Sequence, residues 1–497
     1  MDRLPVVAEA ARHAVARSSR GGFEPWAFLR GKRHAMAAST NLTSSVPVSI
    51  PMRLKRPLHS IVLTLVGGAA LAAAISPALA QESLSGVYLR AIDHDATLAA
   101  AAFQRDAARY ATPLARSALL PQLGANGNYS YSDSETELSG QPTQSRDGTN
   151  RNISVALEQS VFNLSAFRQF DQSKQQVALA EAQYALVSQT LIERAATGYF
   201  NVLAAQDFLR FARAENEALG RQLDQARERF EVGLAAITDV QEAQARFDLT
   251  QATIIDAERQ LRVAELSLAE IAGDGFVALR PLQESIHLPA PSPADPDLWT
   301  QAALANNLTL LSAHHAVDIA SSDVAVNRAG HLPTVSARAD YTDGRSETGV
   351  FPVESTSSSI GLQFSVPLFS GLAVSTRVDQ SRSVLLQRKA ELLSLQRQVE
   401  RDVRDAYQTV NSNAARVKAL EQAVRSSRTA LEASETGLEV GTRTAIDVLD
   451  AQQLLYAAER NAAEARYGYI LSVLRLKAAA GQLQFSDLRE LDQYLQP

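Results

Sequence analysis

Two acidic residues near the C-terminus have the type and spacing of a charged site. Asp447 and Asp450 are three positions apart at the start of a predicted helix, so both side chains would lie on one face of it. Two neighbouring carboxylates can attract cations. From the residues alone, however, the favoured interpretation is two solvated acids that complement the dipole at a helix N-terminus. What decides between these interpretations is the structure around the pair.

No group of residues has the spacing of a catalytic centre. The chain has eight histidines and no cysteine, and it contains no HExxH pattern. His314 and His315 are adjacent, so they would point to different faces of a helix. His331 stands at a predicted junction of helix and strand, where we expect a structural role. We therefore predict no enzymatic activity, no cofactor and no bound metal.

The segment that carries the two acids occurs twice in the chain. Residues 438–452 read "LEVGTRTAIDVLDAQ", and residues 230–244 read "FEVGLAAITDVQEAQ". A constant offset over about a hundred residues indicates two copies of one unit. The offset of 208 positions aligns Gly233 with Gly441, Asp239 with Asp447, and Tyr199 with Tyr407.

Each copy is predicted to contain the same elements in the same order. A helix is followed by two strands, in which apolar and polar residues alternate with period two. A long helix then carries apolar or small residues in the 4-3 rhythm of a coiled coil, and a shorter helix returns. At 1.5 Å per residue, each long helix would measure roughly 100 Å. The predicted ranges are helices 84–117 and 296–329, strands 119–132, 151–161, 331–344 and 357–366, long helices 165–230 and 371–437, and return helices 238–272 and 445–480.

A Val-Gly turn joins the long helix to the return helix in each copy. Val232-Gly233-Leu234 and Val440-Gly441-Thr442 are these turns, and glycine suits the left-handed position of a helix C-cap. Thr238…Gln241 and Thr444…Asp447 are of capping-box type, so we expect them to open the return helices. Arg443 lies between turn and helix, and the residues alone suggest only an exposed arginine in a connection.

The first 80 residues differ from the rest of the chain. Residues 52–80 have a basic start, an apolar stretch and the small-residue ending Ala78-Leu79-Ala80, which is the arrangement of a cleaved secretory signal peptide. A transmembrane anchor is the alternative, but the apolar stretch is short for a span. Residues 1–51 are polar, basic and aperiodic. We expect translation to start at Met52, which would make residues 1–51 a non-native leader.

Charge and composition limit the partners and the fold of the chain that follows residue 80. Without residues 1–80, the chain carries 38 basic and 51 acidic residues and a net charge of −13, which argues against nucleic acid as a partner. Only 6% of the whole chain is aromatic, and alanine-rich segments favour long helices packed through small side chains. We predict a first repeat at 81–279, a Pro-rich connector beside the helices at 280–296, a second repeat at 297–482 and a tail at 483–497.

The predicted strands have the length to cross an outer membrane, but four of them are too few to close a barrel. Open strand edges cannot stand in lipid, so identical copies would have to pool their strands. Three copies would give twelve strands, enough for a channel. The alternative is a secreted coiled-coil structural protein with small β caps and no pore.

Several motifs resemble those of the TolC family of outer-membrane channel-tunnel proteins. The resemblance runs from about Glu82 to about Leu491 and is carried by "LLPQLG", "ATGYFNVLAA", "RFEVGLAAITDVQEA", "GHLPT" and "GTRTAIDVLDAQQLLY". It implies an α+β membrane protein, a homotrimer whose duplicated units pool four strands each into a twelve-stranded β-barrel in the outer membrane lipid. A long coiled-coil helical tunnel would continue this barrel across the periplasm. It also implies a periplasmic adaptor and an inner-membrane ABC or proton-driven transporter as partners, for efflux or type I secretion.

The same resemblance implies roles for individual residues. Asp447 and Asp450 would form rings of carboxylates that bind cations at the narrow periplasmic end of the tunnel. Arg443 would hold the closed state by bonds to a neighbouring protomer, with Asp239, Thr238 and Gln222 as its partners. Leu438 stands where the family often has Tyr, so we expect looser closure. The residues that would contact the adaptor are the turn residues Val232, Gly233, Leu234, Val440, Gly441 and Thr442.

Overall fold

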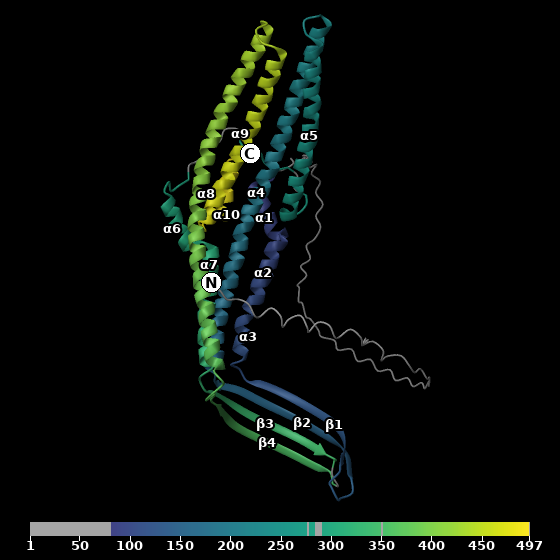
Figure 1. Ribbon diagram of the computed structural model, residues 1–497, viewed down its shortest axis with the longest axis vertical. Helices are drawn as coiled ribbons and strands as arrows, with labels where there is room; N and C mark the ends of the chain where they lie inside the picture. Colours follow the sequence, from purple (N-terminus) through teal and green to yellow (C-terminus); the bar gives the residue numbers. More distant parts are fainter. Residues whose placement is uncertain (1–80, 276–277, 284–290, 349–350, 497) are drawn as a thin grey trace, which may run out of the picture. The chain divides into compact units, whose positions relative to one another are not determined.

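The computed structural model describes residues 81–275, 278–283, 291–348 and 351–496. The predicted leader at 1–51, the predicted signal peptide at 52–80 and part of the connector lie outside the described residues. In the described part, helices and strands follow one another in the order expected for two copies of one unit (Figure 1).

The helix that opens each copy is interrupted, which the sequence did not predict. The first copy has α1 (Leu84–His94), α2 (Ala96–Arg109) and α3 (Ala111–Ser117), and the second has α6 (Pro296–Asn306) and α7 (Leu308–Ala329). Asp95 and Asn307 stand at the breaks and cap the following helices through hydrogen bonds from backbone N–H groups. The prediction of single helices at 84–117 and 296–329 was therefore wrong, because an alanine-rich pattern continues across these caps.

Four antiparallel strands form one sheet in the order β1-β2-β3-β4. They are β1 (Gln122–Thr136), β2 (Gln144–Phe162), β3 (Thr334–Ser346) and β4 (Val353–Ser365). The inner pair, β2 and β3, joins the two copies of the unit. The outer strands β1 and β4 each pair on one side only within the described chain, so the sheet has two open edges.

The register gives this sheet one apolar and one polar face. Leu123 lies opposite Leu157, Leu157 opposite Ala339, and Ala339 opposite Ile360. Three residues further along β1, the row consists of Asn126, Ser154, Thr342 and Ser357. Because successive side chains of a strand point to opposite faces, the two rows lie on opposite sides of the sheet. The apolar face is uncovered, with Ile360 89% exposed and Leu362 76% exposed.

The long helices form two hairpins, as the 4-3 rhythm predicted. In the first hairpin α4 (Leu164–Glu231) packs along α5 (Ile237–Ala272), and in the second α8 (Ala373–Glu439) packs along α9 (Ala445–Ala479) (Figure 1). Helix α7 contacts both α4 and α8, and α9 contacts α4. No helix of the described part is both long and apolar enough to cross a membrane. The buried residues on the predicted seams are Leu191, Ala195, Gly198, Val202 and Leu209 on α4, and Val399, Val403, Val410 and Val417 on α8.

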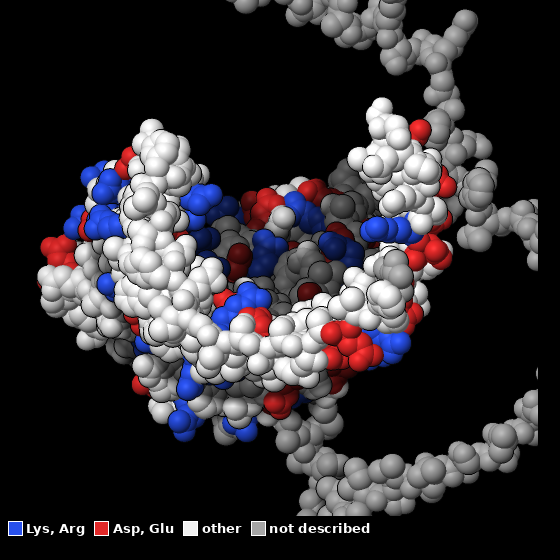
Figure 2. Space-filling view, turned by 90° about the horizontal axis from the view of Figure 1, so that it is seen from below, with Lys and Arg blue, Asp and Glu red and all other residues white. Residues whose placement is uncertain are grey.

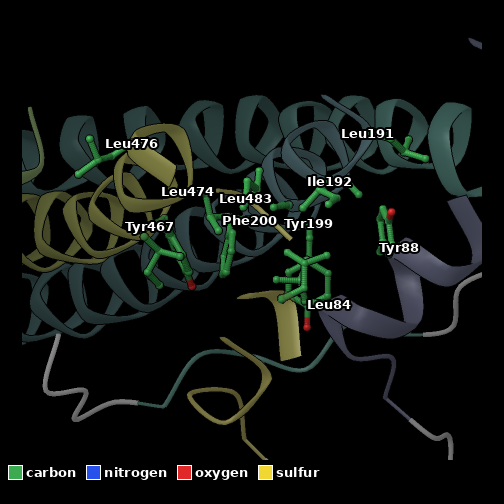
Figure 3. Packing of buried hydrophobic residues seen from close by; sticks show 14 of the residues in the cluster. Leu84, Tyr88, Leu191, Ile192, Tyr199, Phe200, Tyr467, Leu474, Leu476 and Leu483 are labelled. Carbon is green, nitrogen blue, oxygen red and sulfur yellow. The ribbon is translucent and has the colours of Figure 1, made fainter. Parts of the chain in front are cut away.

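The main apolar core lies where α1, α4, α9 and α10 (Phe485–Asp492) meet (Figure 3). The rings of Tyr199 and Phe200 meet edge to face, with their centroids 5.5 Å apart. The Tyr199 hydroxyl lies 2.8 Å from the backbone oxygen of Arg280 and 3.2 Å from that of Glu82, within hydrogen-bond distance of both. One tyrosine thus holds the start of the first copy and the start of the connector against α4. Helix α10 belongs to the tail and was not predicted.

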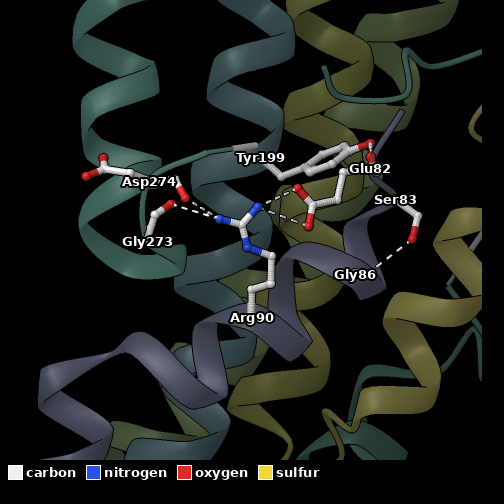
Figure 4. A network of polar contacts seen from close by, with 7 residues as sticks. All are labelled: Glu82, Ser83, Gly86, Arg90, Tyr199, Gly273 and Asp274. Atoms are coloured by element: carbon white, nitrogen blue, oxygen red, sulfur yellow. Dashed lines mark hydrogen bonds and ion pairs between the residues drawn. The ribbon is translucent and has the colours of Figure 1, made fainter. Parts of the chain in front are cut away.

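A second polar contact closes the first copy on itself (Figure 4). Arg90 of α1 donates from Nη1 to Glu82 Oε2 at 3.0 Å, and from Nη2 to the backbone oxygens of Gly273 at 3.2 Å and Asp274 at 2.7 Å. These last two oxygens follow the C-terminus of α5, where carbonyl groups lack partners within the helix. The guanidinium group supplies those partners.

The described part of the connector runs beside the helices and forms one isolated antiparallel bridge, between Leu282 and Leu495. Trp299 donates from Nε1 to the backbone oxygen of Pro293 at 2.8 Å. Tyr407 of α8 donates from its hydroxyl to the backbone oxygen of Ala294 at 2.7 Å. Each bond satisfies a carbonyl group of residues 291–295, which form neither helix nor strand.

Candidate functional site at the helical turns

The two turns between the long and return helices have the same backbone conformation. In the first turn, Gly233 has φ 76° and donates its N–H to the oxygen of Phe230, while Leu234 donates to the oxygen of Arg229. The second turn repeats both bonds, and Gly441 has φ 77°. This is the Schellman arrangement, in which glycine takes the left-handed position. The predicted role of both glycines as helix C-caps is confirmed.

Apolar side chains stand out from both turns. Val232 is 69% exposed, Leu234 is 71% exposed and Val440 is 69% exposed. No atom would lie within 4 Å of a Cβ added to Gly233 or Gly441, so the glycines are open to solvent in the single chain. These exposed apolar ends could contact a second protein.

Asp447 is held by the capping box that the sequence predicted. Its carboxylate accepts hydrogen bonds from the backbone N–H and the hydroxyl of Thr444, both at 2.8 Å. The Asp447 N–H donates to the Thr444 hydroxyl oxygen at 3.2 Å. These bonds, together with the charge of Arg443, lower the pKa of Asp447 below its ordinary value. The carboxylate is therefore ionised at neutral pH.

The capping box predicted at Thr238…Gln241 does not form. Helix α5 begins at Ile237, and its N-cap is Ala236, which corresponds to Thr444 by the offset of 208. Alanine has no side-chain acceptor, so only the return bond remains, from the Ala236 N–H to Asp239 Oδ2 at 3.3 Å. Thr238 lies exposed within the first helical turn. The prediction was wrong because it placed the N-cap at Thr238, two residues after the actual cap.

Asp450 is paired with a residue that the sequence did not single out. Arg246 of α5 donates from Nη2 to Asp450 Oδ1 at 2.7 Å and to Glu242 Oε1 at 3.2 Å. Partial burial disfavours the charged form of Arg246, but the bonds to Asp450 and Glu242 outweigh it and raise the pKa. The four-residue spacing of Glu242 and Arg246 indicates a pair on one helix. Only the packing of α5 near α9 brings Asp450 to the same group.

In the described part of a single chain, Arg443 contacts the helices on both sides of its turn. Its Nη1 lies 3.8 Å from Asp447 Oδ1, and its aliphatic stem covers Gly437, where an added Cβ would lie 2.6 Å from Arg443 Cγ. The side chain is largely exposed. It is not paired there with the predicted partners Asp239, Thr238 and Gln222. Leu438 is half-buried, and its side chain can neither donate nor accept a hydrogen bond.

The acids of both copies occupy matching positions. By the offset of 208, Asp239 corresponds to Asp447 and Glu242 corresponds to Asp450. Both aspartates stand at the third residue of a return helix, and Glu242 and Asp450 stand one turn later. The site thus consists of two acidic levels near the turns, each with one residue from each copy.

Comparison with known proteins places these features in a wider group. A family described as outer membrane efflux protein matches residues 87–274 and again residues 299–482. The outer membrane protein TolC of Vibrio cholerae is 36% identical over 422 residues, which cover 84% of this chain and 95% of that protein. The alkaline protease secretion protein AprF of Pseudomonas aeruginosa is 33% identical over 434 residues, covering 86% and 90%. The solved CmeC outer membrane channel of Campylobacter jejuni shares the fold, with a TM-score of 0.70 at 16% identity, covering 84% of this chain and 91% of that one.

Proposed function

Because the chain belongs to the outer membrane efflux protein family, we propose that it is an exit duct in the outer membrane for efflux and type I secretion. Substrates would pass from an inner-membrane transporter into a tunnel formed by the helical hairpins and would leave through a barrel formed by the sheets. The relatives include both TolC and a protease secretion protein, which supports both pathways. Transport, rather than catalysis, is the activity we assign.

The observation that carries this proposal is the open sheet. Among the described residues, strands β1 and β4 leave unpaired edges on a sheet whose apolar face is uncovered. Unpaired backbone groups are costly in lipid, so a membrane sheet must close on itself. Three chains, with β4 of each chain paired to β1 of the next, would close a barrel of twelve strands with the apolar face toward lipid. The homotrimer and the lipid contact both follow from this closure.

The helices support the same assembly. Helix α5 exposes Leu249, Ile255, Val263 and Leu266, and α8 exposes Leu386 and Leu393. Exposed apolar groups along a helix are typical of a surface that another helix covers. In a trimer, neighbouring copies would cover them and complete a tunnel in the periplasm.

The face of the chain in Figure 2 is hollowed. Lys, Arg, Asp and Glu side chains lie within the hollow, and uncharged residues form much of its rim. A water-filled duct requires a polar inner surface, and charged groups of both signs there suit passage of varied substrates.

The turns would meet the partners of the duct. Their exposed residues would contact a periplasmic adaptor protein. These residues are the apolar Val232, Leu234 and Val440, together with Gly233, Gly441 and Thr442. A trimer presents six such turns. The adaptor would in turn connect the duct to an ABC or proton-driven transporter in the inner membrane.

The residues next to the turns would control the periplasmic entrance. Asp447 and Asp450 from three copies would form two acidic levels that bind cations. Arg443 would hold the closed state through bonds to Asp239, Thr238 and Gln222 of a neighbouring chain in the trimer. A single exposed salt bridge contributes only about 0–1 kcal/mol, and such weak links suit an entrance that must open.

Fractionation and bilayer recording test the proposed function together. We expect the protein in the outer-membrane fraction, as a species that migrates as a trimer without heating and as a monomer after boiling. Reconstituted protein should then conduct ions across planar bilayers. A secreted coiled-coil structural protein would instead be found outside that fraction and would conduct no ions.

A further inference from the structure

One arginine of the first copy joins equivalent acids of both copies. Glu242 and Asp450 are equivalent by the offset of 208, and Arg246 lies within hydrogen-bond distance of each, at 3.2 Å and 2.7 Å. The position in the second copy that corresponds to Arg246 is Leu454, which is exposed and uncharged. In each chain, Arg246 therefore brings one guanidinium group to two acids, one from each copy of the unit.

The two hairpins touch only sparsely near their turns. A small apolar cluster contains five residues of the first hairpin but a single residue of the second, Leu449. Beside it lies a cavity of 390 Å³, lined by residues of α4, α5 and α9 that include Arg246, Leu449 and Gln453. The packing between the hairpins is thus incomplete, so few contacts hold them together at this end. The ion pair from Arg246 to Asp450 is one of those contacts.

We propose that Arg246 clasps the two hairpins of each chain and sets the net charge of the periplasmic entrance. This inference rests on the proposed function. In a trimer, Glu242 and Asp450 would contribute six carboxylates at one level, and Arg246 would balance three of them. The entrance would then attract cations less strongly than its acids alone would, which leaves it passable to anionic substrates.

Removal of the guanidinium group should change two electrical properties. Arg246→Gln leaves Glu242 and Asp450 unbalanced, so the concentration of hexaamminecobalt(III) that half-blocks the channel should fall about tenfold at low salt. The permeability ratio of potassium over chloride should rise. Because salt screens exposed charges, both changes should shrink in 1 M KCl. Loss of the clasp should also raise the single-channel conductance of the unblocked entrance.

Two variants serve as controls. Arg246→Lys keeps the charge, so block and ion selectivity should stay near those of the unmodified channel even if the clasp is weaker. Arg259→Gln removes the same charge from the same helix, but within the described residues Arg259 pairs only with Asp256, one turn earlier. It should leave block, selectivity and conductance unchanged.

The contradicting results are distinct. If Arg246→Gln matched Arg259→Gln in block and selectivity while Asp450→Asn weakened block, the entrance acids would stand and the role of Arg246 would be refuted. If the unmodified trimer conducted no ions, the proposed function would fail and this inference with it.

Discussion

The two helical turns share one backbone and differ in chemistry. Gly233 and Gly441 adopt nearly equal φ values and make equivalent bonds. Yet the second return helix starts with a complete Thr444 capping box beside Arg443, whereas the first starts with Ala236. The first copy contributes Arg246 instead, which reaches the second copy's Asp450. Duplication has therefore kept the turn, while capping and charge have diverged between copies.

The largest expected effect separates the acids of the two copies. Asp447→Ala with Asp450→Ala should abolish block by a trivalent cation in bilayer recordings, because both acidic levels lose their second-copy members. The matched pair, Asp239→Ala with Glu242→Ala, should weaken block less, because Asp447 and Asp450, which we propose to bind the cation, remain. Unchanged block in the Asp447 and Asp450 double variant would remove these residues from the entrance.

A smaller effect is expected at Arg443, the arginine that the first turn lacks. Arg443→Ser should raise single-channel conductance because it removes a link between neighbouring chains of the trimer. By the offset of 208, Arg443 corresponds to Ala235 of the first turn, and Leu234 is the residue before it. Leu234→Ser therefore offers a control that changes a turn residue without loss of charge. Equal conductance of Arg443→Ser and the unmodified channel would exclude a gating role.

Reciprocal substitutions at the N-caps should have opposite signs. Thr444→Ala should lower the stability of the start of α9 by about 0.5–2 kcal/mol, because the hydroxyl acceptor is lost. Ala236→Thr should stabilise the start of α5 by a similar amount, since Asp239 already supplies the other half of the box. Hydrogen exchange of the first-turn amides measures both. Faster exchange in Ala236→Thr would show that the backbones of the two caps differ.

The smallest effect concerns pH. The bonds from Thr444, aided by Arg443, lower the pKa of Asp447 below 3.8. A lowered pKa means that the ionised carboxylate stabilises the helix start above about pH 3.8, and this contribution is lost as the pH falls through the pKa in the folded protein. Thr444→Ala should raise the pKa of Asp447 toward 3.8 in an NMR titration. A pKa that did not move would assign the shift to other charges.

How much the sequence predicts depends on the range of the interaction. The long helices and the two faces of the sheet depend on local periodicity, and both were predicted. The breaks at Asp95 and Asn307 were missed because capping residues inside alanine-rich helices leave the periodicity intact. Asp95 is buried and pairs with Arg194 of α4 at 2.9 Å, so tertiary structure fixes its role.

The candidate site shows the same limit. The turn glycines and the Thr444 capping box were predicted because their bonds span only a few residues. The contact between Arg246 and Asp450 spans 204 positions, and no local pattern announces it. The cap predicted at Thr238 failed because the residue type alone suggested it, whereas the offset of 208 makes Ala236 the equivalent of Thr444.

The central claim is that three identical chains close one barrel, in which β4 of one chain pairs with β1 of the next chain. The chain has no cysteine, so introduced cysteines report contacts directly. Asn126 of β1 and Ser355, Ser357 and Ser359 of β4 lie on the polar face, and Asn126→Cys can be combined with Cys at each of these serines in turn. In at least one register, oxidation in membranes should give disulfide-linked species that end at three chains on a non-reducing gel. Monomers alone in every register would contradict the account.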